Sequence, residues 1–204
     1  MPNHCYNQIT IQSTKEDIEK IVEHLRGKDS MFDFNSLVPM PEEIQDTHLL
    51  HKGGERYHYS QKKWLTTLSK EQKADNPERF QFPSITWVEE NLIDPFTIRR
   101  LTQQHGTAYW YDWSIQHWGT KWNAYDVEYC ISPVKTLSLL HTKITEPCKV
   151  VYTLLTAWAE PRPILKALRD YLQPPDFSEH LELEWRFRDE MEDYNGVFTK
   201  TDEV

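Results

Sequence analysis

The chain opens with an alternation of apolar and polar residues that is typical of a β-strand with one face toward a core. Within residues 4–12, Cys5, Ile9 and Ile11 fall on one face, and polar side chains or tyrosine fall on the other. The next four residues, Ser13–Glu16, have the spacing of a helix capping box. Apolar residues then recur at helical spacing until a glycine ends the pattern. The pattern predicts a β–α unit at the start of the chain.

A second block of regular pattern lies in the C-terminal half. Residues 124–131 and 180–188 alternate between apolar and polar positions, whereas 150–158 is almost wholly apolar, as expected of a central strand. A helical stripe that begins at two prolines, Pro161 and Pro163, separates the last two strands. In chain order these elements are β, α, β, β, α, β. They predict an α+β fold with a ferredoxin-like βαββαβ antiparallel sheet and both helices on one face.

This arrangement predicts the place of each strand. The first and third strands should be central, and the alternating strand 180–188 should lie at an edge. Residues 28–123 then form a long, mainly helical insert between the first helix and the second strand, with a polar loop around Gly53–Gly54. No flexible linker bounds the insert, so we expect it to pack on the same core and residues 1–204 to form a single domain.

Charge and composition exclude several classes of function. The net charge is −9, from 32 acidic against 23 basic residues, which argues against nucleic acid as a partner. No apolar stretch approaches the ~20 residues that span a bilayer, so no membrane is predicted. Three cysteines are too few for a disulfide framework and favour a reducing compartment. We expect a soluble, cytosolic-type protein.

Histidine, cysteine and glycine patterns predict no catalytic or metal site. His48, His51 and His58 share a polar stretch without a nearby cysteine, so a solvated loop is favoured over zinc. The three cysteines lie in or beside predicted strands, where buried thiols are common. Gly119-Thr120-Lys121 lacks the earlier glycine and the preceding strand of a phosphate loop. We therefore predict no enzyme, no cofactor and no metal.

Aromatic residues are concentrated between residues 109 and 123. Trp110, Trp113 and Trp118 fall at helical spacing, and a glycine ends the stripe. Such a stripe usually packs against a core, but large rings can also hold a flat ligand or a partner's side chain. The candidates for a structural or a contact role are Trp113, Trp118, Lys121 and Trp122.

Acidic residues are concentrated near the C-terminus, where residues 176–193 hold eight acids and two arginines. One interpretation is a solvated sheet edge. The other is a negative surface presented to a basic protein groove in imitation of a nucleic-acid backbone. The residues predicted to bind a partner in this way are Asp176, Glu179, Glu182, Glu184, Glu190, Glu192 and Asp193.

Four segments of the chain resemble a known family. They are Met1–Asn7, Leu37–Pro41, Trp118–Ala124 and Thr156–Pro161. In these segments the sequence resembles the YubB-like ferredoxin-like family carried by bacteriophages and plasmids. The resemblance implies a ferredoxin-like sheet in an accessory protein of a mobile element that acts in the bacterial cytoplasm, and it assigns no catalytic residue. Residues 132–149 depart from the family pattern as an additional arm.

Three functions remain in view from the sequence. The leading hypothesis is a non-enzymatic protein that binds and occludes a host or defence-system macromolecule, in the manner of a counter-defence protein. The alternative is a nucleic-acid-binding module in which Tyr6, Trp113 or Trp122 stacks on bases. The third is an enzyme with a cleft between sheet and insert.

Overall fold

The computed structural model describes residues 3–68, 82–134, 147–173, 175–191 and 194–202. Contacts divide the chain into two compact units, which we call the sheet unit (1–39 and 114–204) and the insert unit (40–113). The predicted insert began at residue 28 and ended at residue 123, so both of its ends belong by their contacts to the sheet unit. Its predicted packing on the same core stays a prediction.

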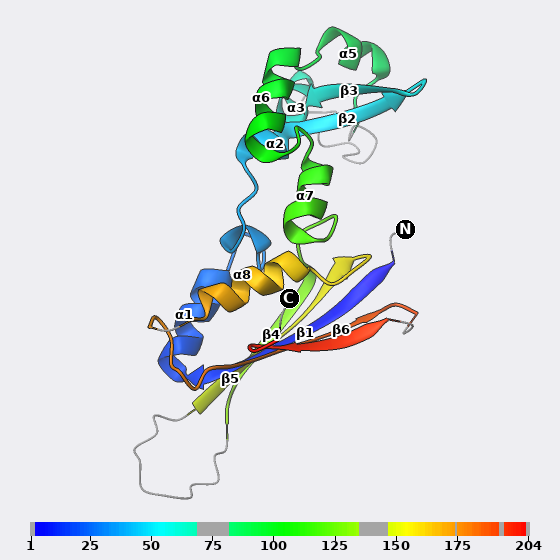
Figure 1. Cartoon of the computed structure of the whole chain (residues 1–204). Helices are drawn as coiled ribbons and strands as arrows, with labels where there is room; N and C mark the ends of the chain where they lie inside the picture. Colours follow the sequence, from blue (N-terminus) through cyan, green and yellow to red (C-terminus); the bar gives the residue numbers. More distant parts are fainter. Residues whose placement is uncertain (1–2, 69–81, 135–146, 174, 192–193, 203–204) are drawn as a thin grey trace, which may run out of the picture. The chain divides into compact units, whose positions relative to one another are not determined.

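The sheet unit contains a five-stranded antiparallel sheet with the strand order β4-β5-β1-β6-β7 (Figure 1). In chain order its elements are β1 (His4–Thr14), α1 (Lys15–Leu25), η1 (Phe34–Ser36), β4 (Tyr125–Pro133), β5 (Pro147–Ala157), α8 (Arg162–Tyr171), β6 (Glu182–Asp189) and β7 (Asn195–Thr199). The helix α7 (Trp110–Trp118) begins in the insert unit and ends in the sheet unit.

The predicted α+β class is confirmed, and β1 and β5 occupy central positions as expected. The edge position predicted for residues 180–188 is wrong, because β7 pairs with the outer side of β6. β7 is only five residues long and has three exposed positions, so its sequence carries little of the alternation that identifies a strand. The predicted arm 132–149 overlaps the ends of β4 and β5, and its residues 135–146 lie outside the described part of the chain.

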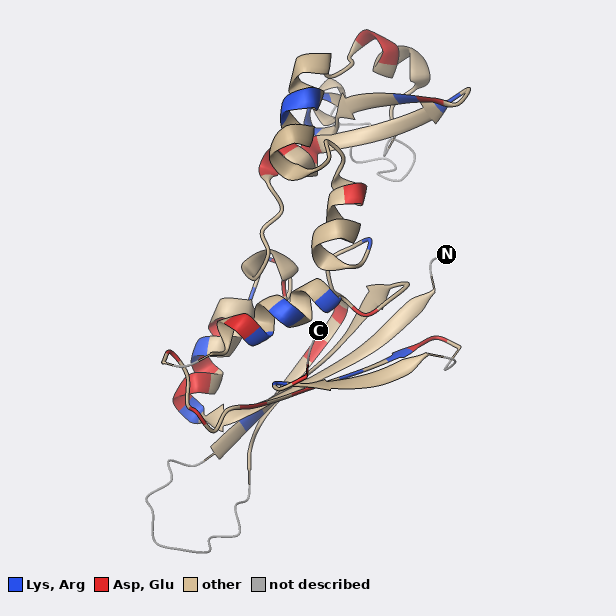
Figure 2. Ribbon diagram, in the orientation of Figure 1, with Lys and Arg blue, Asp and Glu red and all other residues tan. Residues whose placement is uncertain are grey.

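Helices α1 and α8 cover one face of the sheet (Figure 1). The N-cap of α1 is Thr14, whose hydroxyl accepts a hydrogen bond from the Asp17 amide, one residue later than the predicted capping box. Charged residues occur along both helices (Figure 2). Between helices and sheet lies an apolar core, which includes Ile9, Ile11, Ile18, Ile21, Leu25, Val150, Tyr152, Ile164, Leu168 and Trp185. The opposite face of the sheet carries no described helix of this unit, and we call it the open face.

A bulge in β4 changes which residues reach the open face. Tyr125 pairs with Leu155 and Glu128 pairs with Thr153. Two residues of β4, Asp126 and Val127, therefore lie opposite the single residue Leu154 of β5. Asp126, inside the bulge, has a φ of 49°, a left-handed conformation that aspartate tolerates better than most residues. The sequence alternation placed Tyr125 and Glu128 on opposite faces, whereas the bulge brings both to the open face.

The insert unit combines helices with a β-hairpin. Its elements are α2 (Glu42–Asp46), β2 (Thr47–Lys52), β3 (Glu55–Ser60), α3 (Gln61–Thr67), α5 (Ile85–Glu90), α6 (Pro95–His105) and the start of α7. Strands β2 and β3 pair with each other where the sequence predicted a polar loop. Gly53 and Gly54 form the turn, with φ values of 60° and 85°.

Candidate interaction surface

The described residues of the four segments on which the family resemblance rests belong to the sheet unit, apart from Met40 and Pro41. The Thr120 hydroxyl donates to the Ala157 carbonyl and accepts from the Ala157 amide. The Trp158 amide donates to the carbonyl of Asn3 at 2.9 Å. The Trp118 indole donates to the carbonyl of Val38 at 2.9 Å. Trp118 and Val38 are 80 residues apart in the chain, so hydrogen bonds join distant segments.

Asn123 fixes the end of the Trp118–Ala124 segment. Its side-chain oxygen accepts from the Phe34 amide at 2.9 Å, and its amide group donates to the Asp33 carboxylate at 2.6 Å. Gly119 has a φ of 79°, and a Cβ there would lie 2.8 Å from a ring carbon of Pro163. The segment thus has a fixed backbone from which the side chains of Lys121 and Trp122 extend.

Rings and cations of these segments, of β4 and of β6 form two groups of contacts, which together we call the aromatic surface. It consists of Tyr6, Lys121, Trp122, Tyr125, Trp158 and Arg188. The Lys121 ammonium lies 4.6 Å from the ring centroid of Trp122 and 5.6 Å from that of Trp158. The rings of Trp122 and Tyr125 have centroids 6.3 Å apart. The Arg188 guanidinium lies 4.9 Å from the ring centroid of Tyr6.

Register connects the two ends of the aromatic surface. Tyr125 is paired with Leu155, Leu155 with Tyr6, and Tyr6 with Arg188, so these residues form one row across four strands. The row contains a tyrosine on β4 and another on the central strand β1. His4, two residues before Tyr6 on the same face, holds the Tyr125 hydroxyl at 2.6 Å through its Nδ1.

Three rings of the aromatic surface are exposed to a degree that packing does not require. Tyr6 is 40% exposed, Trp122 38% and Trp158 44%. Trp158 also has a φ of 74°, which is rare for a bulky residue. Large exposed rings that lie next to one another are typical of contact surfaces, whereas single exposed apolar residues are ordinary.

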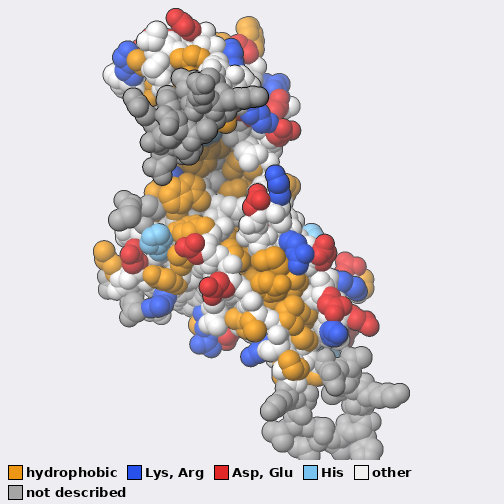
Figure 3. Space-filling model, turned by 180° about the vertical axis from the view of Figure 1, so that it is seen from behind, with side chains coloured by type: hydrophobic (Ala, Val, Ile, Leu, Met, Phe, Trp, Pro, Cys, Tyr) orange, Lys and Arg blue, Asp and Glu red, His pale blue; other side chains and the backbone are white. Residues whose placement is uncertain are grey.

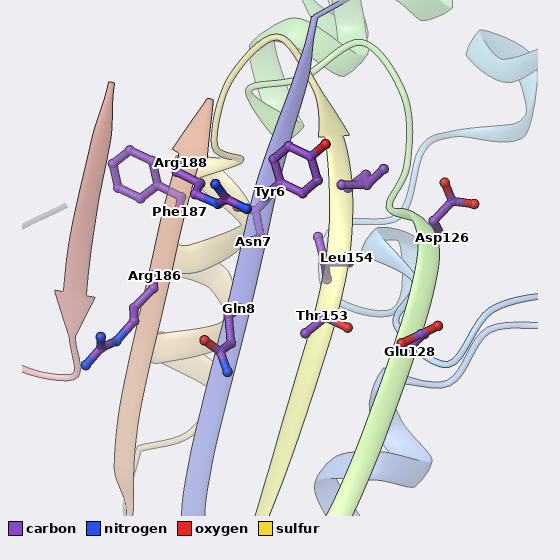
Figure 4. Close-up of a pocket in the computed structure, with 11 residues that line it drawn as sticks. Tyr6, Asn7, Gln8, Asp126, Glu128, Thr153, Leu154, Arg186, Phe187 and Arg188 are labelled. Carbon is purple, nitrogen blue, oxygen red and sulfur yellow. The ribbon is translucent and has the colours of Figure 1, made fainter. Parts of the chain in front are cut away.

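A hollow of about 510 Å³ lies on the open face beside Tyr6. Figure 4 shows Arg186 and Arg188 on the β6 side of this hollow, and Asp126 and Glu128 on the β4 side. The basic and the acidic side chains that line the hollow therefore lie on opposite sides of it. Seen from behind, the sheet unit shows hydrophobic side chains, tyrosine included, with acidic and basic side chains among and beside them (Figure 3).

A buried polar network lies beneath Tyr6. The Asn7 side chain is 3% exposed and accepts a hydrogen bond from the Trp185 indole at 3.0 Å. It donates to the Thr156 hydroxyl at 2.9 Å and to the Cys5 carbonyl at 3.0 Å. Because buried polar groups are costly when unpaired, this network fixes β1 against both of its neighbours.

The tryptophans of the predicted aromatic stripe have different environments. Trp113 and Trp118 are 4% and 5% exposed, whereas Trp122 is 38% exposed. The Trp118 ring also packs edge-on against Phe34, with centroids 5.8 Å apart. Trp122 follows the helix rather than belonging to it, so helical spacing says nothing about its burial.

The predicted acidic surface does not form one cluster. Asp176, Glu179 and Glu182 are exposed at one end of β6, and Glu190 lies at the other end, where its carboxylate accepts from the His4 amide. Glu184, within β6, pairs with Arg186 at 2.7 Å, and this hydrogen bond lowers the pKa of Glu184. Glu192 and Asp193 lie outside the described residues.

Burial of Cys130, His48 and His58 differs from the sequence prediction. Cys5 and Cys148 are buried, but Cys130 is exposed. His48 and His58 are half-buried in the hairpin, and burial lowers the pKa of both. Among the described residues, no three side chains of the types that bind metals are grouped around a common point.

No protein-family model, curated protein or solved structure matches the chain. The resemblance to the YubB-like family therefore rests on the four segments alone. In the described part of the chain, no helix is both long enough and apolar enough to cross a membrane.

Sequence analysis named Tyr6, Lys121 and Trp122 but missed Tyr125, Trp158 and Arg188 as members of the aromatic surface. The alternation of 180–188 does place Arg186 and Arg188 on one face. In register on that face, Arg188 is paired with Tyr6 and Arg186 with Gln8, and only the pairing of β1 with β6 brings these distant residues together.

Proposed function

We propose that this protein is a non-enzymatic binding protein, of the accessory kind that a phage or plasmid carries, and that it contacts a macromolecular partner through the aromatic surface. The observation that carries the proposal is the presence of three exposed rings in contact with two cations, Tyr6 with Arg188 and Lys121 with both Trp122 and Trp158. Tyrosine, tryptophan and arginine are the residues most often found at the energetic centres of interfaces.

The support beneath this surface favours binding. Rings lose little conformational freedom when they are buried by a partner, because they have only two side-chain torsions. The backbone under Tyr6 is fixed by the Asn7 network, and that under Trp122 by Asn123. A contact surface on regular strands and fixed loops is already arranged for its partner, which reduces the entropic cost of association.

We propose a ferredoxin-like topology for the sheet unit, and the strand order supports it. Without β7, the order is β4-β5-β1-β6, with α1 after β1 and α8 after β5. This order and these two helices on one face fit a βαββαβ unit with an added fifth strand.

Affinity purification with matched variants tests the proposed function. Bait proteins are wild type, a Tyr6→Ala/Trp122→Ala double variant and Phe96→Ala, since Phe96 is 85% exposed in the insert unit. We expect wild type and Phe96→Ala to retain the same macromolecule, and the double variant to lose it with an unchanged melting temperature. Equal recovery by all three baits would contradict the proposed surface.

A second candidate for the partner contact is the acidic end of β6. A hollow there is lined by Glu179, Glu182 and Glu184, and it would accept a basic protein segment. Replacing Glu179 and Glu182 with lysine should slow association with such a partner, and added salt should slow the wild type in the same way. An unchanged association rate at low salt would exclude this end of the strand.

A further inference from the structure

The aromatic surface combines the two features that bind single-stranded nucleic acid without a dedicated pocket. Exposed rings stack on bases, and neighbouring cations attract phosphates. Sheets that recognise RNA commonly carry such rings on central strands, where the bases spread over the open face. Tyr6 is on the central strand β1, and its neighbour in register on β6 is Arg188.

We propose that the aromatic surface binds a short stretch of single-stranded nucleic acid, with bases stacked on Tyr6, Trp122 and Trp158. This inference rests on the proposed function and names the partner class of the same surface.

The spacing of the rings suits a few nucleotides. Tyr6 and Tyr125 are separated by one strand, which places their backbones about 10 Å apart. Trp122 lies in contact with Tyr125, and Trp158 shares the Lys121 ammonium with Trp122. The rings therefore follow one another at separations that an unstacked single strand can span.

The charges of the open face indicate a path for the phosphates. Arg188 lies on β6, and Asp126 and Glu128 lie on β4, on the far side of the hollow. The charge of Arg186, also on β6, is offset by its pairing with Glu184. Phosphates would be attracted toward β6 and repelled from β4. The backbone of the strand would then lie over β6, and its bases would extend from there across β1. Removing the charge at Asp126 and Glu128 should then strengthen binding, since both carboxylates oppose the phosphates.

The net charge of −9 shapes the expected affinity. A protein that binds chiefly through phosphates loses affinity steeply with salt. Here Lys121 and Arg188 are the two cations that contact rings of the aromatic surface. Two phosphate contacts on a single strand predict a slope of about −1.4 for the logarithm of affinity against the logarithm of salt. Stacking of the bases on the rings should supply the rest of the binding free energy.

The decisive experiment compares a strand with bases and a strand without them. Fluorescence anisotropy is measured with a labelled single-stranded oligothymidylate of about eight nucleotides and with an abasic strand of equal length. We expect the strand with bases to bind at least tenfold more tightly, because each stacked base contributes about 1–3 kcal/mol. Heparin serves as a polyanion without bases and should compete poorly.

Variants separate stacking from charge. Tyr6→Ala and Trp122→Ala should each weaken binding about tenfold or more, and Trp122→Phe should restore most of the loss because it keeps a ring. Phe96→Ala and Lys15→Ala are the matched controls for an exposed ring and an exposed cation elsewhere, and both should bind like wild type. Asp126→Asn/Glu128→Gln should bind more tightly than wild type.

Equal binding of the abasic strand, or heparin competing as well as the oligonucleotide, would overturn the inference in favour of a general anion surface. An absence of oligonucleotide binding would also overturn it. If a protein partner is still recovered by wild type and lost by Tyr6→Ala/Trp122→Ala, the proposed function stands and only the nucleic-acid inference falls. If the double variant recovers that protein as well, the proposed function and the nucleic-acid inference are both contradicted.

Discussion

Trp118 and Trp122 are four residues apart, yet the folded chain places one in a core and the other at the surface. The Trp118 indole is 5% exposed and donates a hydrogen bond to Val38, whereas Trp122 is 38% exposed beside Lys121. Helical spacing could predict the burial of Trp118. The exposure of Trp122 could not be predicted, because it depends on where the chain runs after Gly119.

This difference predicts opposite effects of truncating the two rings. Trp118→Ala should lower the free energy of unfolding by about 3–5 kcal/mol, the cost of removing a large buried ring. Trp122→Ala should lower it by less than about 1 kcal/mol, because the ring is partly hydrated in the folded state. Chemical denaturation of both variants measures the difference. A large loss for Trp122→Ala would mean that this ring is structural, as the sequence alone suggested.

The cysteines offer a test of burial at single positions. Burial raises the pKa of the Cys5 thiol to about 11, so almost none of it is thiolate near neutral pH. Cys130 is exposed on β4, and Cys148 is buried. At pH 8, iodoacetamide should therefore label Cys130 in the folded protein and leave the other two unmodified, as measured by mass spectrometry of peptides. Rapid labelling of Cys5 would contradict the described core.

At the scale of elements, strong patterns gave reliable predictions. The long β1, the apolar β5 and the stripe of α8 were each predicted from their periodicity. The hairpin β2–β3 was missed because its residues include three histidines and several charged side chains, which resemble a loop in composition. The bulge in β4 was also missed, because it depends on pairing with β5 rather than on the sequence of β4.

Two glycines with left-handed backbones provide a matched test of element ends. Gly53→Ala should cost about 1–2 kcal/mol, the ordinary penalty for a Cβ at positive φ, since nothing lies within 4 Å of that position. Gly119→Ala should cost more, because the new Cβ would also meet Pro163 at 2.8 Å. Thermal unfolding of both variants measures the difference. Equal losses of stability would show that the chain at the end of α7 shifts to accommodate the new Cβ without further cost.

At the scale of the whole molecule, the sequence predicted the order of the sheet elements but not the surface that they form. The residues of the aromatic surface come from β1, β4, β6 and the loops that follow α7 and β5. No local pattern connects Tyr6 with Arg188, so their contact follows only from the register of the sheet. The division at residues 39 and 113 also depends on contacts between distant segments.

The division into units predicts that the sheet unit folds alone. Val38 and Trp118 are joined by a hydrogen bond, so a short glycine–serine linker can replace residues 40–113. Because the sheet unit has its own buried core, the shortened chain should unfold cooperatively and keep strand-rich circular dichroism. A shortened chain without a cooperative transition would show that the sheet unit depends on the insert.

The central claim is that the partner contacts the aromatic surface, and site-specific photo-crosslinking tests it most directly. A photoreactive phenylalanine analogue is placed at position 6 in one sample and at position 96 in another, where the exposed Phe96 belongs to the insert unit. After illumination in cells, we predict that the partner is covalently attached through position 6 and that position 96 yields no such adduct. An adduct from position 96 together with none from position 6 would contradict the account.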